Sequence, residues 1–296
     1  MYRSRLCLLG LVLSVYLAGV LFLSSVTLQD QIKVPKGFQN GIVATNRGRA
    51  MEIARGVGSR QANLHWCQPL KYITNSKSRP VIALVSFPGS GNTWLRYLLQ
   101  QATGLYTGSV YKDYGLLKNG FPGESIVNNT VIVVKTHEWG SSARQRFDKA
   151  ILLIRAPGPA ILAEFNRQSG GHIGFASPDR YRRNKGKYWQ QFVRDKLRTW
   201  RVTNLDWLQN FTGPIHIVLY EELVSNLEWT LRSLVDFLEL SVSDSELKCA
   251  VNRREGIYKR KQRVFSLDPF TAEMKSCLAS EHELVLKELQ SYLKSS

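Results

Sequence analysis

The stretch from Val81 to Trp94 constrains the fold of this chain more than any other part of it. The apolar run Val81 to Val85 leads into Ser-Phe-Pro-Gly-Ser-Gly-Asn-Thr-Trp. A buried strand that ends in a glycine-rich loop and continues as a helix presents unpaired backbone N–H groups and the positive end of the helix dipole. The stretch therefore predicts an anion-binding loop and favours a nucleotide enzyme. The residues of this loop are Gly89, Ser90, Gly91, Asn92, Thr93 and Trp94.

The loop departs from the nucleoside-triphosphate loop GxxxxGK[ST], because Asn92 and Thr93 follow Gly91 and no lysine does. A kinase or an ATPase is therefore disfavoured. Phe-Pro-Gly-Ser-Gly-Asn-Thr-Trp instead resembles the 5′-phosphosulfate loop of sulfotransferases. That resemblance implies 3′-phosphoadenosine-5′-phosphosulfate as the donor cosubstrate. The simple alternative is a strand, turn and helix whose glycines only relieve backbone strain.

The N-terminus carries a second strong pattern, since Leu6 to Val26 contain no charged residue. At about 1.5 Å of rise per residue, such a run is long enough to cross the roughly 30 Å hydrocarbon core of a membrane. Arg3 and Arg5 precede the run. We therefore expect residues 1–5 in the cytosol, residues 6–26 as an uncleaved signal anchor rather than a cleaved signal peptide, and the remainder in the lumen.

Sequons and cysteines agree with a luminal location. Asn128-Asn129-Thr130 and Asn210-Phe211-Thr212 predict N-glycosylation at Asn128 and Asn210. Outside the apolar run, Cys67, Cys249 and Cys277 allow one disulfide of unspecified pairing, and their spacing predicts no metal site. We expect a single-pass type II membrane protein of the Golgi.

The formal net charge of +17 and the isoelectric point near 9.9 indicate an anionic partner. A sulfated nucleotide and an acidic sugar would both be attracted by this positive field, and the simple alternative is a basic solvated surface. Nucleic acid is disfavoured as a partner behind a luminal anchor.

The rest of the chain predicts an α/β domain. Residues 27–61 have scattered glycines and arginines without a period, as in a stem, and residues 62–296 are long enough for one domain. Buried strands alternate with helical patterns, which predicts a parallel sheet with helices on both faces. The expected strands are Val81–Val85, Val131–Val134, Ala150–Ile154 and Ile215–Leu219; the expected helices are Asn92–Ala102, one that runs through Phe165, and one with a stripe from Leu223 to Leu238.

The end of the second expected strand reads Val-Val-Lys-Thr-His and carries two candidate catalytic residues, Lys135 and His137. Neutral imidazole accepts a proton from a hydroxyl near pH 7, and a lysine neutralises charge that grows on a bridging oxygen. The element resembles the Lys-Thr-His element of cytosolic sulfotransferases. The structural alternative is that His137 is only a polar residue at the end of a strand.

Two further elements resemble the 3′-phosphate site of sulfotransferases. Arg155 follows the third expected strand before Ala-Pro-Gly-Pro, and a guanidinium presents a planar fork to phosphate oxygens. Arg254 and Gly256 lie in Arg-Arg-Glu-Gly, which resembles the family's Arg-Lys-Gly turn. Tyr220-Glu221-Glu222-Leu223 resembles a segment that begins the next helix, and we interpret it as structural.

These elements occur in the order typical of sulfotransferases, which implies a P-loop-like fold. The loop and the segment Phe165 to His172, with the sequence Phe-Asn-Arg-Gln-Ser-Gly-Gly-His, resemble the sulfotransferase-like domain of WSC-domain-containing (WSCD) membrane proteins. The cysteine-rich WSC modules are absent from this sequence.

The sequence also departs from the sulfotransferase pattern. Gly89 stands where most relatives place a lysine or arginine, so either Lys135 or Arg96 supplies that charge or catalysis is weak. Ala163 stands where a phosphate-binding serine is usual, and the neighbouring Glu164 would repel phosphate if it pointed inward. A preorganised cation in a dry site contributes about 3 kcal/mol to a barrier.

The sequence thus predicts transfer of a sulfuryl group to a hydroxyl, on a glycan by family resemblance, with no metal requirement. One alternative is a catalytically silent relative that binds acidic glycans or nucleotide. Another is a nucleotide kinase with an unusual loop.

Overall fold

The computed structural model describes residues 64–74, 78–258 and 268–295, all within the unit Ser59–Ser296. The expected cytosolic tail, signal anchor and stem all lie outside these residues. Within the described ranges, no helix is both long and apolar enough to cross a membrane.

A five-stranded sheet, parallel throughout, lies at the centre of the fold with the order β2-β3-β1-β4-β5. The predicted parallel α/β architecture is confirmed. The sequence patterns missed β2, because this two-residue strand has no apolar run, and they placed β3 too early. The strands are β1 (Ile82–Ser86), β2 (Gly108–Ser109), β3 (Val134–Thr136), β4 (Lys149–Ile154) and β5 (Ile215–Leu219).

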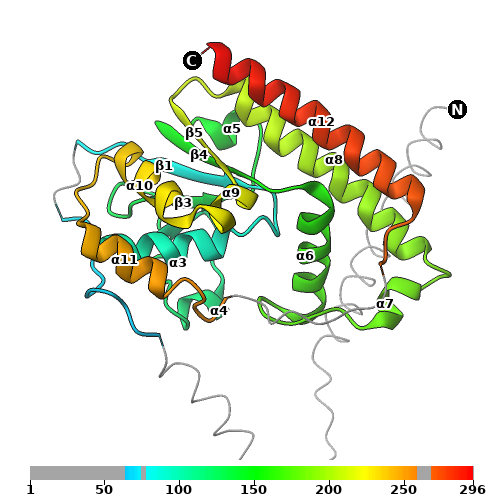
Figure 1. Ribbon diagram of the computed structural model, residues 1–296, viewed down its shortest axis with the longest axis horizontal. Coiled ribbons are helices and arrows are strands. Elements are labelled where there is room, and N and C mark those ends of the chain that lie inside the picture. Colours follow the sequence, from blue (N-terminus) through cyan, green and yellow to red (C-terminus); the bar gives the residue numbers. More distant parts are fainter. Residues whose placement is uncertain (1–63, 75–77, 259–267, 296) are drawn as a thin grey trace, which may run out of the picture. The chain divides into compact units, whose positions relative to one another are not determined.

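Helices cover both faces of this sheet (Figure 1). Alternate residues of a strand point to opposite faces, so Ala83 and Val85 of β1 pack in one core and Ile82 and Leu84 in the other. The first core includes α6, α8 and α12, and the second includes α3, α10 and α11. The helices are α3 (Asn92–Thr103), α4 (Tyr114–Leu117), α5 (Ser141–Arg144), α6 (Pro157–Gly170), α7 (Pro178–Arg182), α8 (Lys187–Asn210), α9 (Tyr220–Ser225), α10 (Leu227–Phe237), α11 (Asp244–Asn252) and α12 (Ala272–Ser295).

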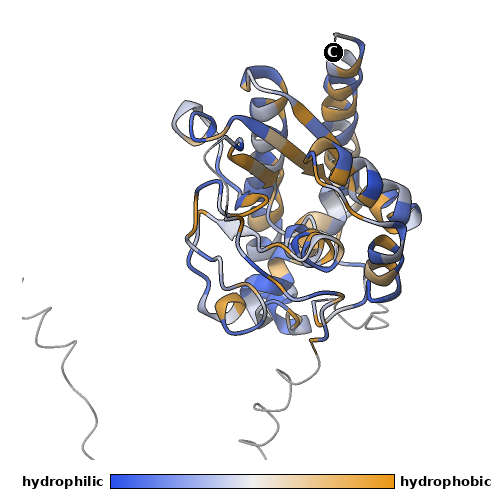
Figure 2. Ribbon diagram, turned by 90° about the vertical axis from the view of Figure 1, so that its left-hand side faces the viewer, coloured by the Kyte–Doolittle hydropathy of each residue, from blue (hydrophilic) through white to orange (hydrophobic). Residues whose placement is uncertain are grey.

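Hydrophobic residues line the inner surfaces of both layers. Figure 2 shows hydrophobic stretches on the central strands and one-sided hydrophobic stripes on the helices around them. The long helices α8 and α12 lie side by side (Figure 1), and Trp200 and Trp207 of α8 are fully buried between them and the sheet. Burial of such large side chains contributes roughly 3 kcal/mol each.

The leucine stripe from Leu223 to Leu238 belongs to two helices rather than the single helix expected. α9 ends at Ser225, and Asn226, with φ −125° and ψ 51°, separates it from α10. The leucines of the stripe are buried on both sides of this break between α9 and α10. The apolar spacing therefore identified the core-facing side but not the break, since a single non-helical residue leaves the spacing almost unchanged.

A disulfide joins Cys67, ahead of β1, to Cys249 in α11, and Cys277 is an exposed free thiol. This is the one disulfide that the three cysteines outside the apolar run allowed. Both predicted glycosylation residues, Asn128 and Asn210, are exposed. The Oδ1 of Asn128 accepts a hydrogen bond of 2.6 Å from the Thr130 hydroxyl within the sequon.

Candidate active site at the carboxyl edge of the sheet

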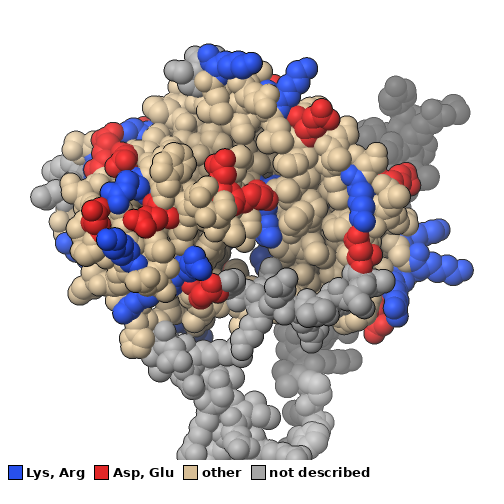
Figure 3. All heavy atoms as spheres, in the orientation of Figure 1, with Lys and Arg blue, Asp and Glu red and all other residues tan. Residues whose placement is uncertain are grey.

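The carboxyl ends of the central strands open into a cavity of about 1440 Å³. Ligands of open parallel sheets bind at this edge. Six lysine and arginine side chains line the cavity against three acidic ones. Figure 3 shows the surface hollowed near the centre of this face, with basic side chains at the hollow. The site therefore attracts an anion.

The loop between β1 and α3 forms one wall. Gly89 and Gly91 have φ values of +87° and +96°, which glycine adopts without strain. The Asn92 Nδ2 donates to the Leu84 carbonyl (3.0 Å) and the Ser86 hydroxyl (3.1 Å), which anchors the loop to the strand it leaves. The backbone N–H groups of the first turn of α3 have no preceding helical turn to donate to, so they are available to an anion.

The structure brings Gly89, Gly91, Asn92, Thr93 and Trp94 to the cavity, but not the Ser90 side chain. Ser90 is buried, and its backbone N–H donates to the Phe87 carbonyl (3.2 Å). Its hydroxyl has no hydrogen-bond partner among the described residues. Ser90 thus shapes the turn rather than lining the pocket.

His137 follows β3 and lies beside the end of β1. Its Nδ1 is 2.7 Å from the Ser86 carbonyl oxygen, and because a carbonyl can only accept, Nδ1 carries the proton. The ring stacks on Tyr111, with 5.6 Å between centroids, and lines the cavity. Burial, and then the charge of Lys135, lowers the pKa of His137 to about 3. A neutral imidazole with an unprotonated Nε2 is the form that a general base requires.

Lys135, the other candidate catalytic residue, reaches the same cavity from β3. Burial, and then the charge of Arg96, lowers the pKa of its ammonium group to about 8. Among the described residues no carboxylate forms an ion pair with it. Lys135 is therefore a cation at neutral pH with its charge available to a ligand.

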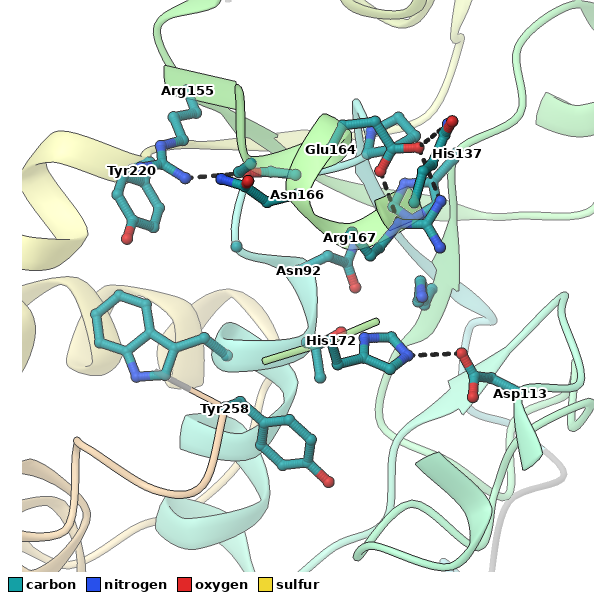
Figure 4. A pocket seen from close by; sticks show the side chains of 18 of the residues that line it. Asn92, Asp113, His137, Arg155, Glu164, Asn166, Arg167, His172, Tyr220 and Tyr258 are labelled. Carbon is teal, nitrogen blue, oxygen red and sulfur yellow. Dashed lines mark hydrogen bonds and ion pairs between the residues drawn. The ribbon is translucent and has the colours of Figure 1, made fainter. Parts of the chain in front are cut away.

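Arg155, at the end of β4, contacts the anion-binding loop. Its Nη1 donates to the Gly89 carbonyl (3.0 Å), and its guanidinium lies 4.1 Å from the centre of the Tyr220 ring. Figure 4 shows Arg155 and Tyr220 together at one end of the pocket. Burial lowers the pKa of Arg155, and its buried Nε has no partner among the described residues. That unpaired donor points to a ligand oxygen.

The turn that carries Arg254 and Gly256 docks on α3. The Trp94 Nε1 donates to the Arg254 carbonyl (2.7 Å), and the Tyr97 hydroxyl donates to the Arg253 carbonyl (2.8 Å). Arg254 lines the cavity, whereas Gly256 lies against the Tyr97 ring, where a Cβ would approach to 2.8 Å. Gly256 therefore permits the turn without lining the pocket.

Arg96 does not supply the charge missing at Gly89, so that expectation was wrong. Its guanidinium is fully buried and pairs with Glu124 at 2.7 Å, and its Nε donates to the Thr107 hydroxyl (2.9 Å). It does not line the cavity. A helical position two residues beyond the loop points a side chain into the core behind it, which the motif alone did not reveal.

Glu164 does face the cavity, together with Ala163, but its charge is compensated. Its carboxylate accepts hydrogen bonds from Arg167 Nε (2.6 Å), Arg167 Nη2 (2.7 Å) and Gln168 Nε2 (2.7 Å). The expected repulsion of phosphate is therefore offset by the adjacent guanidinium.

Several cavity residues had no predicted ligand role. His172 Nε2 lies 2.7 Å from the Asp113 carboxylate across the pocket (Figure 4). Burial raises the pKa of Asp113, but the hydrogen bonds from His172 and from the Leu116 and Gly115 backbone together lower it. Tyr220, considered only structural, lines the cavity, as does Arg167. Arg167 and His172 belong to the Phe165 to His172 segment, so that motif was a sequence signal for them.

The described residues fit a phosphorylated, sulfated nucleotide. Free backbone donors at the loop, two glycines where a side chain would clash, and the unpaired Nε of Arg155 form a cradle for anionic oxygens. The rings of Trp94 and Tyr220 meet edge to face, with 5.9 Å between their centres, and add an aromatic surface to the wall of the cavity. No cluster of three metal-ligating side chains occurs in the parts of the chain that the structure describes.

Fold and site together define a parallel α/β protein with an anion-binding loop, a neutral histidine and basic side chains in one pocket. The chain is 50% identical to a WSCD family member of Aedes aegypti, across 93% of each chain. It is 53% identical to one of Drosophila melanogaster, across 77% of this chain and 79% of that relative. The chain belongs to the WSCD family. No family model matches it.

The chain also has weaker likenesses to solved structures. Mouse sulfotransferase SULT7A1 complexed with PAP is 17% identical, with a TM-score of 0.47, over 73% of this chain and 89% of that chain. Retinol dehydratase in complex with androsterone and inactive cofactor PAP is 14% identical, with a TM-score of 0.40, over 76% and 84% of the two chains.

Proposed function

We propose that this protein is a membrane-anchored sulfotransferase that moves a sulfuryl group from 3′-phosphoadenosine-5′-phosphosulfate to a hydroxyl group. The observation that carries the proposal is the meeting of three strand ends in one cavity. Gly89 and Gly91 follow β1, Lys135 and His137 lie at the end of β3, and Arg155 follows β4. Each of these residues offers a chemical group that suits the role its motif implied.

Different residues of the pocket bind different parts of the donor molecule. The loop from Gly89 to Trp94 holds the phosphosulfate through backbone N–H groups, and Arg155 with Arg254 binds the 3′-phosphate. The donor supplies a sulfuryl group on a phosphate leaving group. Both arginines present several N–H donors, which suits a dianionic phosphate.

His137 acts as the general base. Its Nε2 accepts the proton of the acceptor hydroxyl while the new sulfur–oxygen bond forms, and the electron pair of the bond that breaks stays on the 5′-phosphate oxygen. Lys135 neutralises the charge that grows there. A well-placed base contributes about 10²- to 10⁴-fold in rate, and an electrostatic contact of this kind about 10²- to 10³-fold.

The acceptor that we propose is a carbohydrate on a glycoprotein or glycolipid. The proposed topology is type II, with residues 6–26 as the anchor and the pocket in the Golgi lumen, where Asn128 and Asn210 would be glycosylated. The +17 net charge supports an acidic carbohydrate as acceptor, and the exposed Asn128 and Asn210 support the luminal location.

A second candidate function is a catalytically silent protein that binds acidic glycans or nucleotide. Gly89 and Ala163 favour it, because the loop cation and a phosphate-binding hydroxyl are both absent. The two candidates agree on an anionic ligand and differ on turnover.

Calorimetric titration of the purified full-length chain in mild detergent tests the donor class. We expect 3′-phosphoadenosine-5′-phosphate (PAP) to bind at least tenfold more tightly than ADP, and Arg155→Ala to remove most of that preference. Arg144→Ala is the control, since Arg144 pairs with Asp206 outside the cavity. Tighter binding of ADP than of PAP would favour the kinase alternative, and a folded chain that binds neither nucleotide would contradict the proposal.

A further inference from the structure

The backbone at Gly89 excludes the cation that sulfotransferase loops place there. A Cβ at this position would lie 2.3 Å from the Ala160 carbonyl oxygen and 2.9 Å from the Glu164 backbone nitrogen. Both atoms belong to the backbone of α6, which cannot move aside as a side chain would. The close packing of α6 against the loop is therefore possible only because residue 89 has no side chain.

The same packing brings an ion pair of α6 to the pocket. The Glu164 side chain is 1% exposed, and a carboxylate buried to that extent requires strong hydrogen bonds. Arg167, three residues later and on the same side of the helix, provides two of them through Nε and Nη2. This bidentate contact fixes the plane of the guanidinium.

The ion pair with Glu164 does not use every N–H donor of the Arg167 guanidinium. Nη1 forms no hydrogen bond with the described part of the chain, and the side chain lines the cavity at 42% exposure. Its second Nη2 proton also points away from the carboxylate, because each Nη atom carries two protons. Arg167 can therefore hold Glu164 and still donate to a ligand.

Arg167 stands at the end of the pocket that contains the proposed catalytic residues. Figure 4 shows Glu164, Arg167 and His137 gathered there, opposite Arg155 and Tyr220. The charge of Arg167 contributes to the lowered pKa values of both His137 and Lys135. Its guanidinium is thus electrostatically close to the groups that would face the sulfuryl end of the donor.

We propose that Arg167, oriented by Glu164, supplies the positive charge at the sulfuryl end that Gly89 cannot supply. Arg167 is then a catalytic residue and Glu164 a positioning residue. The guanidinium donates to an oxygen of the sulfuryl group itself, which PAP lacks. The electron pair of the sulfur–oxygen bond that breaks stays on the 5′-phosphate oxygen, and the acceptor proton goes to His137. This inference rests on the proposed sulfotransferase function.

The test compares the affinity of the full-length chain for PAP, which lacks the sulfuryl group, with its affinity for the intact donor. We expect Arg167→Gln to weaken binding of the donor roughly tenfold or more and to change PAP binding less than about twofold. Arg201→Gln is the matched control: Arg201 is 39% exposed and pairs with Glu281 at 3.0 Å, away from the cavity. It should change neither affinity.

Glu164→Gln tests the positioning role, because an amide oxygen cannot accept the same bidentate contact from a guanidinium. We expect it to lower the ratio of donor affinity to PAP affinity in the same direction as Arg167→Gln. A purely structural ion pair would lower thermal stability and leave this ratio unchanged, which would overturn the positioning role.

The outcomes separate this inference from the proposed function. If the wild-type chain binds PAP and donor but Arg167→Gln weakens both equally or neither, Arg167 does not contact the sulfuryl end and the inference fails alone. If the folded wild-type chain binds neither nucleotide, the proposed function fails and the inference with it.

Discussion

The Nδ1 of His137 donates a hydrogen bond of 2.7 Å to the carbonyl oxygen of Ser86, across the ends of the neighbouring strands β3 and β1. This contact fixes the tautomer in which Nε2 holds a lone pair. Because Ser86 is the last residue of the strand that leads into the glycine-rich loop, one hydrogen bond fixes the position of the proposed base relative to the proposed donor site.

The lowered pKa of His137 makes folding stability depend on pH. With a pKa near 3 in the folded chain and about 6.5 in the unfolded chain, the unfolded state binds more protons between these values. The free energy of unfolding should therefore fall as the pH decreases from 6.5 towards 3, by about 1–2 kcal/mol from this residue between pH 7 and 5. Urea unfolding at both pH values measures it, and His137→Gln should show a smaller decrease; an equal decrease in the variant would mean that His137 titrates normally.

Removal of the charge of Arg167 should change the titration of His137. Since that charge contributes to the lowering, Arg167→Gln should raise the pKa of His137 towards its ordinary value. Histidine chemical shifts followed by NMR report this, with His137→Gln identifying the signal. Arg201→Gln should leave the titration unchanged, and an unchanged pKa in Arg167→Gln would place the guanidinium away from the imidazole.

Gly89 should tolerate no side chain. Gly89→Ala is expected to lower the free energy of unfolding by about 2 kcal/mol or more, because strain from the positive φ adds to a clash with the α6 backbone. Gly186, with φ +83° and open space around a Cβ, isolates the φ contribution, so Gly186→Ala should cost only about 1 kcal/mol. Equal costs in chemical unfolding would show that α6 does not restrict the loop.

The ion pair between Arg96 and Glu124 should be structural. Arg96→Met leaves a fully buried carboxylate without its partner and should lower the free energy of unfolding by about 3–5 kcal/mol. Arg96→Met combined with Glu124→Leu should recover part of this loss, since no buried charge then remains. The PAP affinity of the folded double variant should match that of the wild type. A large loss of affinity would show that Arg96 contributes to ligand binding.

The sequence predicted the residues at the carboxyl edge of the sheet better than the contacts of the helices that surround it. His137 and Arg155 could be placed because each directly follows an apolar strand, and parallel strands bring such positions together. Arg96 was misplaced because its role depends on a distant partner, Glu124, with no local signature. The relation of Gly89 to α6 was equally hidden, because a close approach between backbones of two elements leaves only a glycine in the sequence.

The central claim is sulfuryl transfer, and the most direct measurement is the incorporation of ³⁵S-sulfate from labelled donor into membrane glycans by full-length protein. We compare the wild type with His137→Gln, and PAP affinity is measured for both. The account predicts incorporation by the wild type, a loss of about 10²-fold or more in the variant, and PAP affinities within about twofold of each other. PAP binding without incorporation in either protein would contradict the account and leave the silent binder in its place.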